Sequence, residues 1–150
     1  MDASQADLRE LYQEVIFDHN RNPRNFRRLE DATHYALGHN PLCGDKLTVY
    51  LKVVDDIIQE ASFLGEGCAI STASASLMTE AVKGLTLDEF EKLYGEVHQL
   101  LTENHPDHDM GKLEVLSGVR EFPARVKCAS LAWHTTHNAV NQLSETAQTE

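Results

Sequence analysis

Apolar residues near the start of the chain recur at steps of three and four residues, which is the period of a helix with one buried face. Five of them follow this spacing: Leu8, Leu11, Tyr12, Val15 and Ile16. The pattern predicts a helix over residues 4–19. We expect it to end before Pro23, because proline removes a backbone donor and disfavours helical backbone in the residue that precedes it.

The pattern changes in the next part of the chain. Residues 26–41 show neither a clear helical nor a clear strand period, and no element is predicted there. Residues 46–54 and 57–64 alternate in part and are rich in β-branched side chains, which is typical of strands. Asp55 and Asp56 separate them as a turn, and a link this short joins only antiparallel strands. The sequence therefore predicts a β-hairpin.

Three further helices are predicted, over residues 69–83, 85–101 and 123–143. The first consists of small side chains, which allow a helix to lie close to a sheet. The second begins with a capping box formed by Thr86 and Glu89.

The segments between these helices are less regular. Residues 104–109 form a polar turn, and residues 113–119 have no clear period. Strands followed by helices favour an α+β fold. We expect a single domain over residues 1–150, with a small antiparallel sheet and helices packed mainly on one face.

Length, composition and charge limit the class of protein and the partners that this chain can have. A chain of 150 residues has the usual size of one domain, and its 41% hydrophobic and 25% charged residues are typical of a globular protein. The net charge of −11 repels nucleic acid and anionic membrane surfaces, so neither is expected as a partner. The charge either favours docking to a basic protein surface or serves only solubility. No stretch approaches the ~18 apolar residues of a membrane span and the acidic N-terminus lacks a secretory signal, so a cytoplasmic location is expected.

The three cysteines are the residues best suited to carry chemistry. Their odd number and the expected reducing compartment argue against a disulfide framework and favour metal binding or catalysis. Cys43 precedes the first predicted strand, and Gly44 lets the backbone turn so that Cys43 and Asp45 can face one centre. Cys68 leaves the second strand through glycines and lies at a helix start, where unpaired N–H groups stabilise a thiolate.

Cys128 lies near the start of the last predicted helix, so the same stabilisation of a thiolate is expected there. Arg125 and Lys127 add positive charge close to it. The hairpin brings the other two cysteines to the same end of the sheet, whereas spacing alone does not show that Cys128 joins them. Three thiolates and one carboxylate would form a closed tetrahedral zinc site. Thiolates also suit iron–sulfur clusters, and free cysteines are often only small buried apolar residues.

Two pairs of histidines invite a metal-binding interpretation. His134 and His137 share a helix face, and His105 and His108 flank the predicted polar turn. Histidines without a chemical role are far commoner than metal ligands, so neither pair is assigned a function. A cysteine–histidine hydrolase would need a histidine beside a cysteine, and the sequence does not supply that contact.

Four motifs occur in the order found in one known family: Asn22-Pro23-Arg24-Asn25-Phe26, Cys43-Gly44-Asp45, Gly65-Glu66-Gly67-Cys68-Ala69-Ile70-Ser71 and Cys128. Together they resemble the IscU/SufU (NifU N-terminal-like) iron–sulfur assembly proteins over residues 6–142. The long stretch between Cys68 and Cys128 is similar to the SufU branch, whose insertion would fall at residues 100–120. Lys127 stands where IscU scaffolds carry a histidine, and the proline-proline-valine-lysine signal that recruits a chaperone to IscU is absent.

The resemblance implies a zinc site and a partner. The four implied ligands are Cys43, Asp45, Cys68 and Cys128. The implied partner is a cysteine desulfurase of the SufS type, whose persulfide Cys43 would accept, with Cys128 as the second candidate. Downstream SUF cluster-assembly machinery would then take the sulfur, and the chain would be a zinc-dependent sulfurtransferase. Arg125 and Lys127 are interpreted as residues that set the local field or contact the partner.

Two alternatives use the same four residues. A scaffold would assemble a [2Fe–2S] cluster on them without being an enzyme, although the lysine at position 127 argues against it. A structural zinc domain would carry no transfer chemistry. Such a site should be buried and inert to alkylation, so the accessibility of the cysteines separates it from the transfer function.

Overall fold

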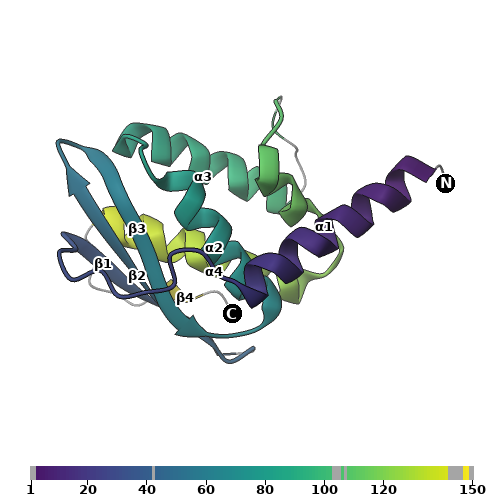
Figure 1. The fold of residues 1–150 in the computed structure, drawn as a ribbon, viewed down its shortest axis with the longest axis horizontal. Helices are drawn as coiled ribbons and strands as arrows, with labels where there is room; N and C mark the ends of the chain where they lie inside the picture. The colour runs from purple at the N-terminus through teal and green to yellow at the C-terminus, as the bar shows by residue number, and fades with distance from the viewer. Residues whose placement is uncertain (1–2, 42, 103–105, 107, 142–146, 149–150) are drawn as a thin grey trace.

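The computed structural model describes residues 3–41, 43–102, 106, 108–141 and 147–148. The three long strands form an antiparallel sheet with the helices against one face, as predicted (Figure 1). None of the described helices is long and apolar enough to cross a membrane. In chain order, the elements are α1 (Ala3–Arg21), β1 (His34–Asn40), β2 (Asp45–Val54), β3 (Ile57–Glu66), α2 (Ala69–Val82), α3 (Leu87–Thr102), the 3₁₀ helix η1 (Gly111–Glu121), α4 (Pro123–Val140) and β4 (Ala147–Gln148).

The predicted hairpin is formed by β2 and β3. The strands pair antiparallel, and Lys46 at the start of β2 lies opposite Glu66 at the end of β3. Asp55 and Asp56 make the turn with φ angles of 53° and 63°. Positive φ at both residues is the left-handed conformation that a type I′ hairpin turn requires. The pairing therefore brings together the two segments that carry the first two cysteines.

β1 lies in the segment for which the hydrophobic pattern predicts no element. Its buried positions hold Ala36, Gly38 and Asn40, whereas the larger Tyr35 and Leu37 are exposed. This reverses the usual distribution of large apolar and small or polar residues over the two faces of a strand. Pairing with β2, and not the pattern of the strand itself, thus holds β1 in the sheet.

β4 is a second strand that the sequence pattern does not predict. It pairs in parallel with Gly38 and His39 of β1 over two residues, so the sheet order is β3-β2-β1-β4. The short parallel addition leaves the antiparallel arrangement of the three long strands unchanged.

The four predicted helices correspond to α1, α2, α3 and α4. The capping box of α3 forms as expected: the Glu89 N–H donates to Thr86 Oγ1 over 3.1 Å, and the Thr86 N–H donates to Glu89 Oε1 over 2.9 Å. α4 begins at the predicted Pro123 and ends at Val140, and residues 142–143 of the prediction lie outside the described part of the chain.

The segment between α3 and α4 contains one element that has no clear period in the sequence. Residues 113–119 belong to η1, whose buried Leu113 and Leu116 join the core and which packs on α1 and α3. Of the predicted polar turn at residues 104–109, residues 104, 105 and 107 lie outside the described part of the chain.

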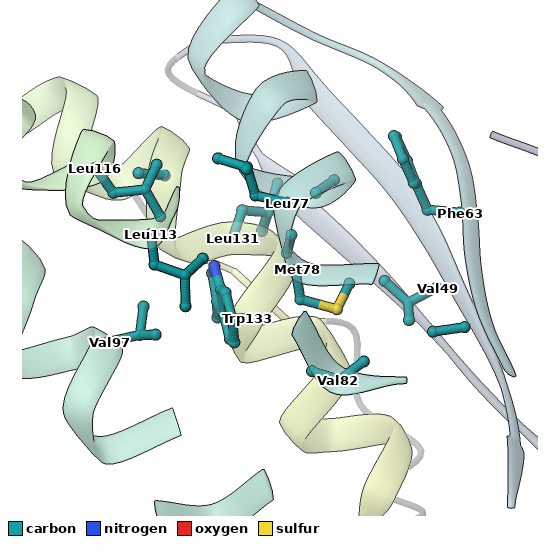
Figure 2. Packing of buried hydrophobic residues seen from close by; sticks show 14 of the residues in the cluster. Val49, Phe63, Leu77, Met78, Val82, Val97, Leu113, Leu116, Leu131 and Trp133 are labelled. Atoms are coloured by element: carbon teal, nitrogen blue, oxygen red, sulfur yellow. The ribbon is translucent and has the colours of Figure 1, made fainter. Parts of the chain in front are cut away.

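The core lies where α2 and α4 cover the sheet and meet η1 and α3 (Figure 2). Met78 and Leu77 of α2 are central to it, with Trp133 of α4 beside them. Val49 and Phe63 close the core from the sheet side. α2 and α4 are thereby fixed on the sheet, and both run from the end that carries the cysteines.

Candidate metal centre

The hairpin places Asp45 and Cys68 in direct contact. Asp45 is the first residue of β2 and is fully buried, while Cys68 follows the end of β3. The backbone N–H of Cys68 donates to Asp45 Oδ1 over 2.9 Å. Gly44 has a φ of 72°, a backbone conformation that favours glycine, and it allows the chain to turn between Cys43 and Asp45.

Cys128 reaches the same place from α4. Its side chain is fully buried, and its thiol donates to the sulfur of Cys43 over 3.3 Å. One ligand atom each from Cys43, Asp45 and Cys128 lies within 4.8 Å of the others. The structure therefore brings Cys128 to the end of the hairpin, which the spacing of the cysteines does not show.

Cys68 lies beside this group as the N-cap residue of α2. Its sulfur accepts a hydrogen bond from the Ser71 N–H over 3.4 Å, in the manner of a capping side chain. The group of atoms within 4.8 Å does not include Cys68 among the described residues. Three of the four predicted ligands thus converge, and the fourth caps the helix next to them.

The environment of Cys128 differs from the sequence-based expectation. Burial raises the pKa of the Cys128 thiol, and the neighbouring side chains of Cys43, Asp45 and Cys68 raise it further. The sequence predicts that the helix start lowers the pKa of Cys128, and for the metal-free protein this prediction is wrong. The residue lies inside α4 rather than at its end, and desolvation of the charged form outweighs the helix dipole.

The donor set fits a soft divalent cation. Asp45 Oδ2 is buried and has no hydrogen-bond partner among the described residues, so this carboxylate offers a free oxygen. The neighbouring thiols can become thiolates, and several negative groups at this separation require a cation to be stable together. Three sulfurs and one carboxylate oxygen are a set that zinc accepts.

Asn40 is a further polar residue at this site that the sequence patterns do not single out. It ends β1, is fully buried, and pairs with Asp45 across the sheet. Its side-chain Nδ2 donates to the sulfur of Cys128 over 3.8 Å. A polar residue at a buried strand position just before Cys43 is a signal that could have identified it, had β1 been predicted.

The two predicted basic residues lie on the first turns of α4, outside the ligand group. Arg125 is exposed and lines a groove of about 780 Å³ with Phe122 and Ile70 among its walls. Lys127 is half-buried next to Cys128 in the chain. Among the described residues, neither Arg125 nor Lys127 forms an ion pair.

The histidine pairs do not enter the candidate centre. His134 Nδ1 lies 3.2 Å from the Tyr94 hydroxyl, and His137 stacks on the Tyr94 ring and contacts Glu91. His108 is bonded to Glu96, and His105 lies outside the described residues. No hydrogen bond among the described residues joins a histidine to a cysteine, which removes the support for a cysteine–histidine hydrolase.

Comparison with known proteins gives consistent matches over nearly the whole chain. The family described as "NifU-like N terminal domain" matches residues 11–146. The zinc-dependent sulfurtransferase SufU of Bacillus subtilis is 42% identical over 138 residues, covering 90% of this chain and 92% of that protein. The iron–sulfur cluster assembly scaffold protein IscU of Thermotoga maritima is 40% identical over 136 residues, covering 89% and 95% of the two chains.

A solved structure supports the same fold. A protein of Fervidobacterium islandicum, named as an iron–sulfur cluster assembly scaffold protein for the SUF system, superposes with a TM-score of 0.80. It is 30% identical, and the match covers 85% of this chain and 94% of that one. The small sheet with helices on one face is therefore shared with that protein.

The position of Gly67 yields a test of the candidate centre. A Cβ at this residue would lie 2.5 Å from Asp45 Oδ1, so Gly67→Ala should displace the carboxylate from its contact with the Cys68 N–H. We expect the affinity for zinc to fall about 10- to 100-fold, the usual effect of disturbing the contacts that orient a ligand. Competition with a chelator of known affinity measures this.

Gly95→Ala is the matched control, because a Cβ at Gly95 on α3 meets no atom within 4 Å. It should leave zinc binding unchanged. Equal zinc affinities in the two variants would show that the position of the Asp45 carboxylate does not matter for the metal.

Proposed function

This chain belongs to the family of NifU-like N-terminal domains, and we propose that it acts in iron–sulfur cluster assembly as a zinc-bound sulfur acceptor for a cysteine desulfurase of the SufS type. One observation carries the proposal. Cys43 is exposed, yet its sulfur lies 3.3 Å from the sulfur of the fully buried Cys128. A thiol that belongs to a ligand cluster and is also open to a partner suits transfer better than purely structural metal binding.

The four residues that would hold zinc are Cys43, Asp45, Cys68 and Cys128. Zinc, when bound, keeps its ligand thiols deprotonated at neutral pH and so supplies thiolates for nucleophilic chemistry. Asp45 offers the free Oδ2 as its ligand atom, with Oδ1 held by the Cys68 N–H. A carboxylate is a harder ligand than a thiolate, which favours a site that can exchange one ligand.

The transfer step assigned to Cys43 is a thiol–persulfide exchange. The Cys43 thiolate attacks the outer sulfur of the desulfurase persulfide, and a new sulfur–sulfur bond forms as the old one breaks. The cysteine of the desulfurase leaves as a thiolate and takes up a proton, and Cys43 becomes the persulfide. No external oxidant or reductant is needed. Cys128, the second candidate, is fully buried and would have to leave the core to reach the same persulfide.

Arg125 and Lys127 are proposed as contacts to the desulfurase. The chain carries a net charge of −11, whereas Arg125 places an exposed positive charge beside an apolar groove. Arg125 would meet an acidic group of the partner beside the groove, and Lys127 would add to the same field. Sulfur accepted in this way would pass to the downstream SUF machinery in the cytoplasm.

The scaffold function is the principal alternative. A relative from Thermotoga maritima carries the name of an assembly scaffold, and the same four residues could ligate a [2Fe–2S] cluster. A structural zinc domain is less well supported, because the exposure of Cys43 is not typical of a closed structural site.

Metal analysis separates these functions. Protein purified without oxygen and without added metal should contain one zinc per chain and be colourless. Iron with inorganic sulfide and absorption above roughly 400 nm, where thiolate-bound iron clusters absorb, would contradict the transfer function and support the scaffold. Zinc with all three cysteines inert to alkylation would support the structural domain.

Peptide mapping after reaction with a persulfide-loaded desulfurase tests the acceptor. The mass of one added sulfur atom should appear on the peptide that contains Cys43, because this thiol is exposed. Cys43→Ser should abolish acceptance of sulfur, whereas Cys128→Ser should still form the Cys43 persulfide at a reduced yield. Added sulfur on Cys128 with Cys43 unmodified would contradict the assignment.

Charge reversal tests the partner contact. Arg125→Glu should weaken binding of the desulfurase about tenfold at low salt, and less at high salt, because exposed charges are screened. Lys83→Glu makes the same change in charge at an exposed residue at the far end of α2 and should have little effect. Calorimetric titration at two salt concentrations measures both. An equal loss in the two variants would indicate a general charge effect rather than a contact.

A further inference from the structure

Asn40 is held between two of the candidate ligands by its backbone. It lies opposite Asp45 in the β1–β2 pairing, and its carbonyl accepts a hydrogen bond from the Cys43 N–H over 3.3 Å. Its side chain is fully buried. The position of the Asn40 amide is therefore fixed by the same turn that carries Cys43.

The amide of Asn40 is only partly satisfied. Nδ2 donates to the sulfur of Cys128 over 3.8 Å, and Oδ1 is buried without a hydrogen-bond partner among the described residues. A buried acceptor without a hydrogen bond lowers the free energy of unfolding. An apolar side chain at residue 40 would not carry this cost. Packing alone thus does not explain an amide at residue 40.

The candidate ligands differ in the N–H donors that they receive. Asp45 Oδ1 accepts from the Cys68 N–H, and the Cys68 sulfur accepts from the Ser71 N–H. Cys128 accepts from Asn40. Within the described residues, no N–H donates to the sulfur of Cys43. The exposed thiol is therefore the one ligand group without such a donor.

We propose that Asn40 is a positioning residue that holds the Cys128 sulfur in the interior, draws on its electron density, and leaves Cys43 as the reactive thiol. This inference rests on the proposed function. A hydrogen bond to a thiolate stabilises its charge and reduces its nucleophilicity, as outer contacts of metal ligands commonly do. In this arrangement the Cys128 sulfur remains a fixed ligand and the Cys43 sulfur is the nucleophile.

The test replaces the amide in the full chain and uses zinc and cobalt(II) as probes. Asn40→Leu and Asn40→Ala should each lower the zinc affinity about 10- to 100-fold in competition with a chelator. In the cobalt(II)-loaded variants, the sulfur-to-metal absorption should move to longer wavelength, because a sulfur without a donor gives up electron density more easily. Metal-free Asn40→Leu should unfold at the same or a higher urea concentration than the unchanged chain, since the unpaired oxygen is gone.

Asn138→Ala is the control, because it removes another buried amide from α4 away from the sulfurs. It should leave the cobalt absorption in place. Unchanged zinc affinity and absorption in both Asn40 variants would overturn the proposal, as would failure of both metal-free variants to fold, since the amide would then be structural. A chain that binds zinc but accepts no sulfur would refute the proposed function alone, because neither metal readout requires sulfur transfer.

Discussion

The arrangement of this protein depends on a carboxylate buried at one end of its sheet. Asp45 is fully buried, and a charged group in that position is unfavourable unless it is paired and hydrogen-bonded. The Cys68 N–H satisfies one oxygen and requires Gly67 to pass close to the carboxylate. The second oxygen lies among thiols that would repel it once ionised. The hairpin and α4 thus bring together donor groups whose negative charges a cation would offset once they ionise, which is the physical basis for proposing a metal at this end of the fold.

The packing of α4 on the sheet sets the position of Cys128. A Cβ at Gly38 would lie 2.1 Å from Thr135 Oγ1, so only glycine allows α4 to approach β1 this closely. Thr135 follows Cys128 by about two helical turns, so the two side chains lie on the same face of the helix. On the other side, the Ser74 hydroxyl of α2 donates to the carbonyl of Ala129 over 2.5 Å. Small residues on β1 and α2 thereby bring the Cys128 sulfur to the end of β1.

Local patterns predict the parts of the site that lie close in sequence. The alternation of residues 46–64 and the Asp55–Asp56 turn are enough to predict the hairpin, and the hairpin predicts that the segments of Cys43 and Cys68 meet. β1 escapes prediction because its large residues face solvent, and Asn40 is overlooked with it. The approach of Cys128 depends on how α4 packs, which no spacing encodes, so only the family resemblance anticipates it. The sequence also places Cys128 at a helix start without showing that it is desolvated there, which is why the expected direction of its pKa is wrong.

Three thiols with the same intrinsic chemistry differ here because they lie in different structural settings. Cys128 is inside a packed helix, and moving it would disturb the contacts of α4 with the sheet and with α2. Cys68 caps α2, so its sulfur is tied to the start of that helix. Cys43 lies on the short turn between β1 and β2, is exposed, and is held by one backbone hydrogen bond to Asn40. Under the proposed function, the partner would reach Cys43 at the surface without displacing the buried Cys128. The proposed division between a sulfur that stays in the core and a sulfur that reacts therefore follows from the different elements that carry Cys128 and Cys43.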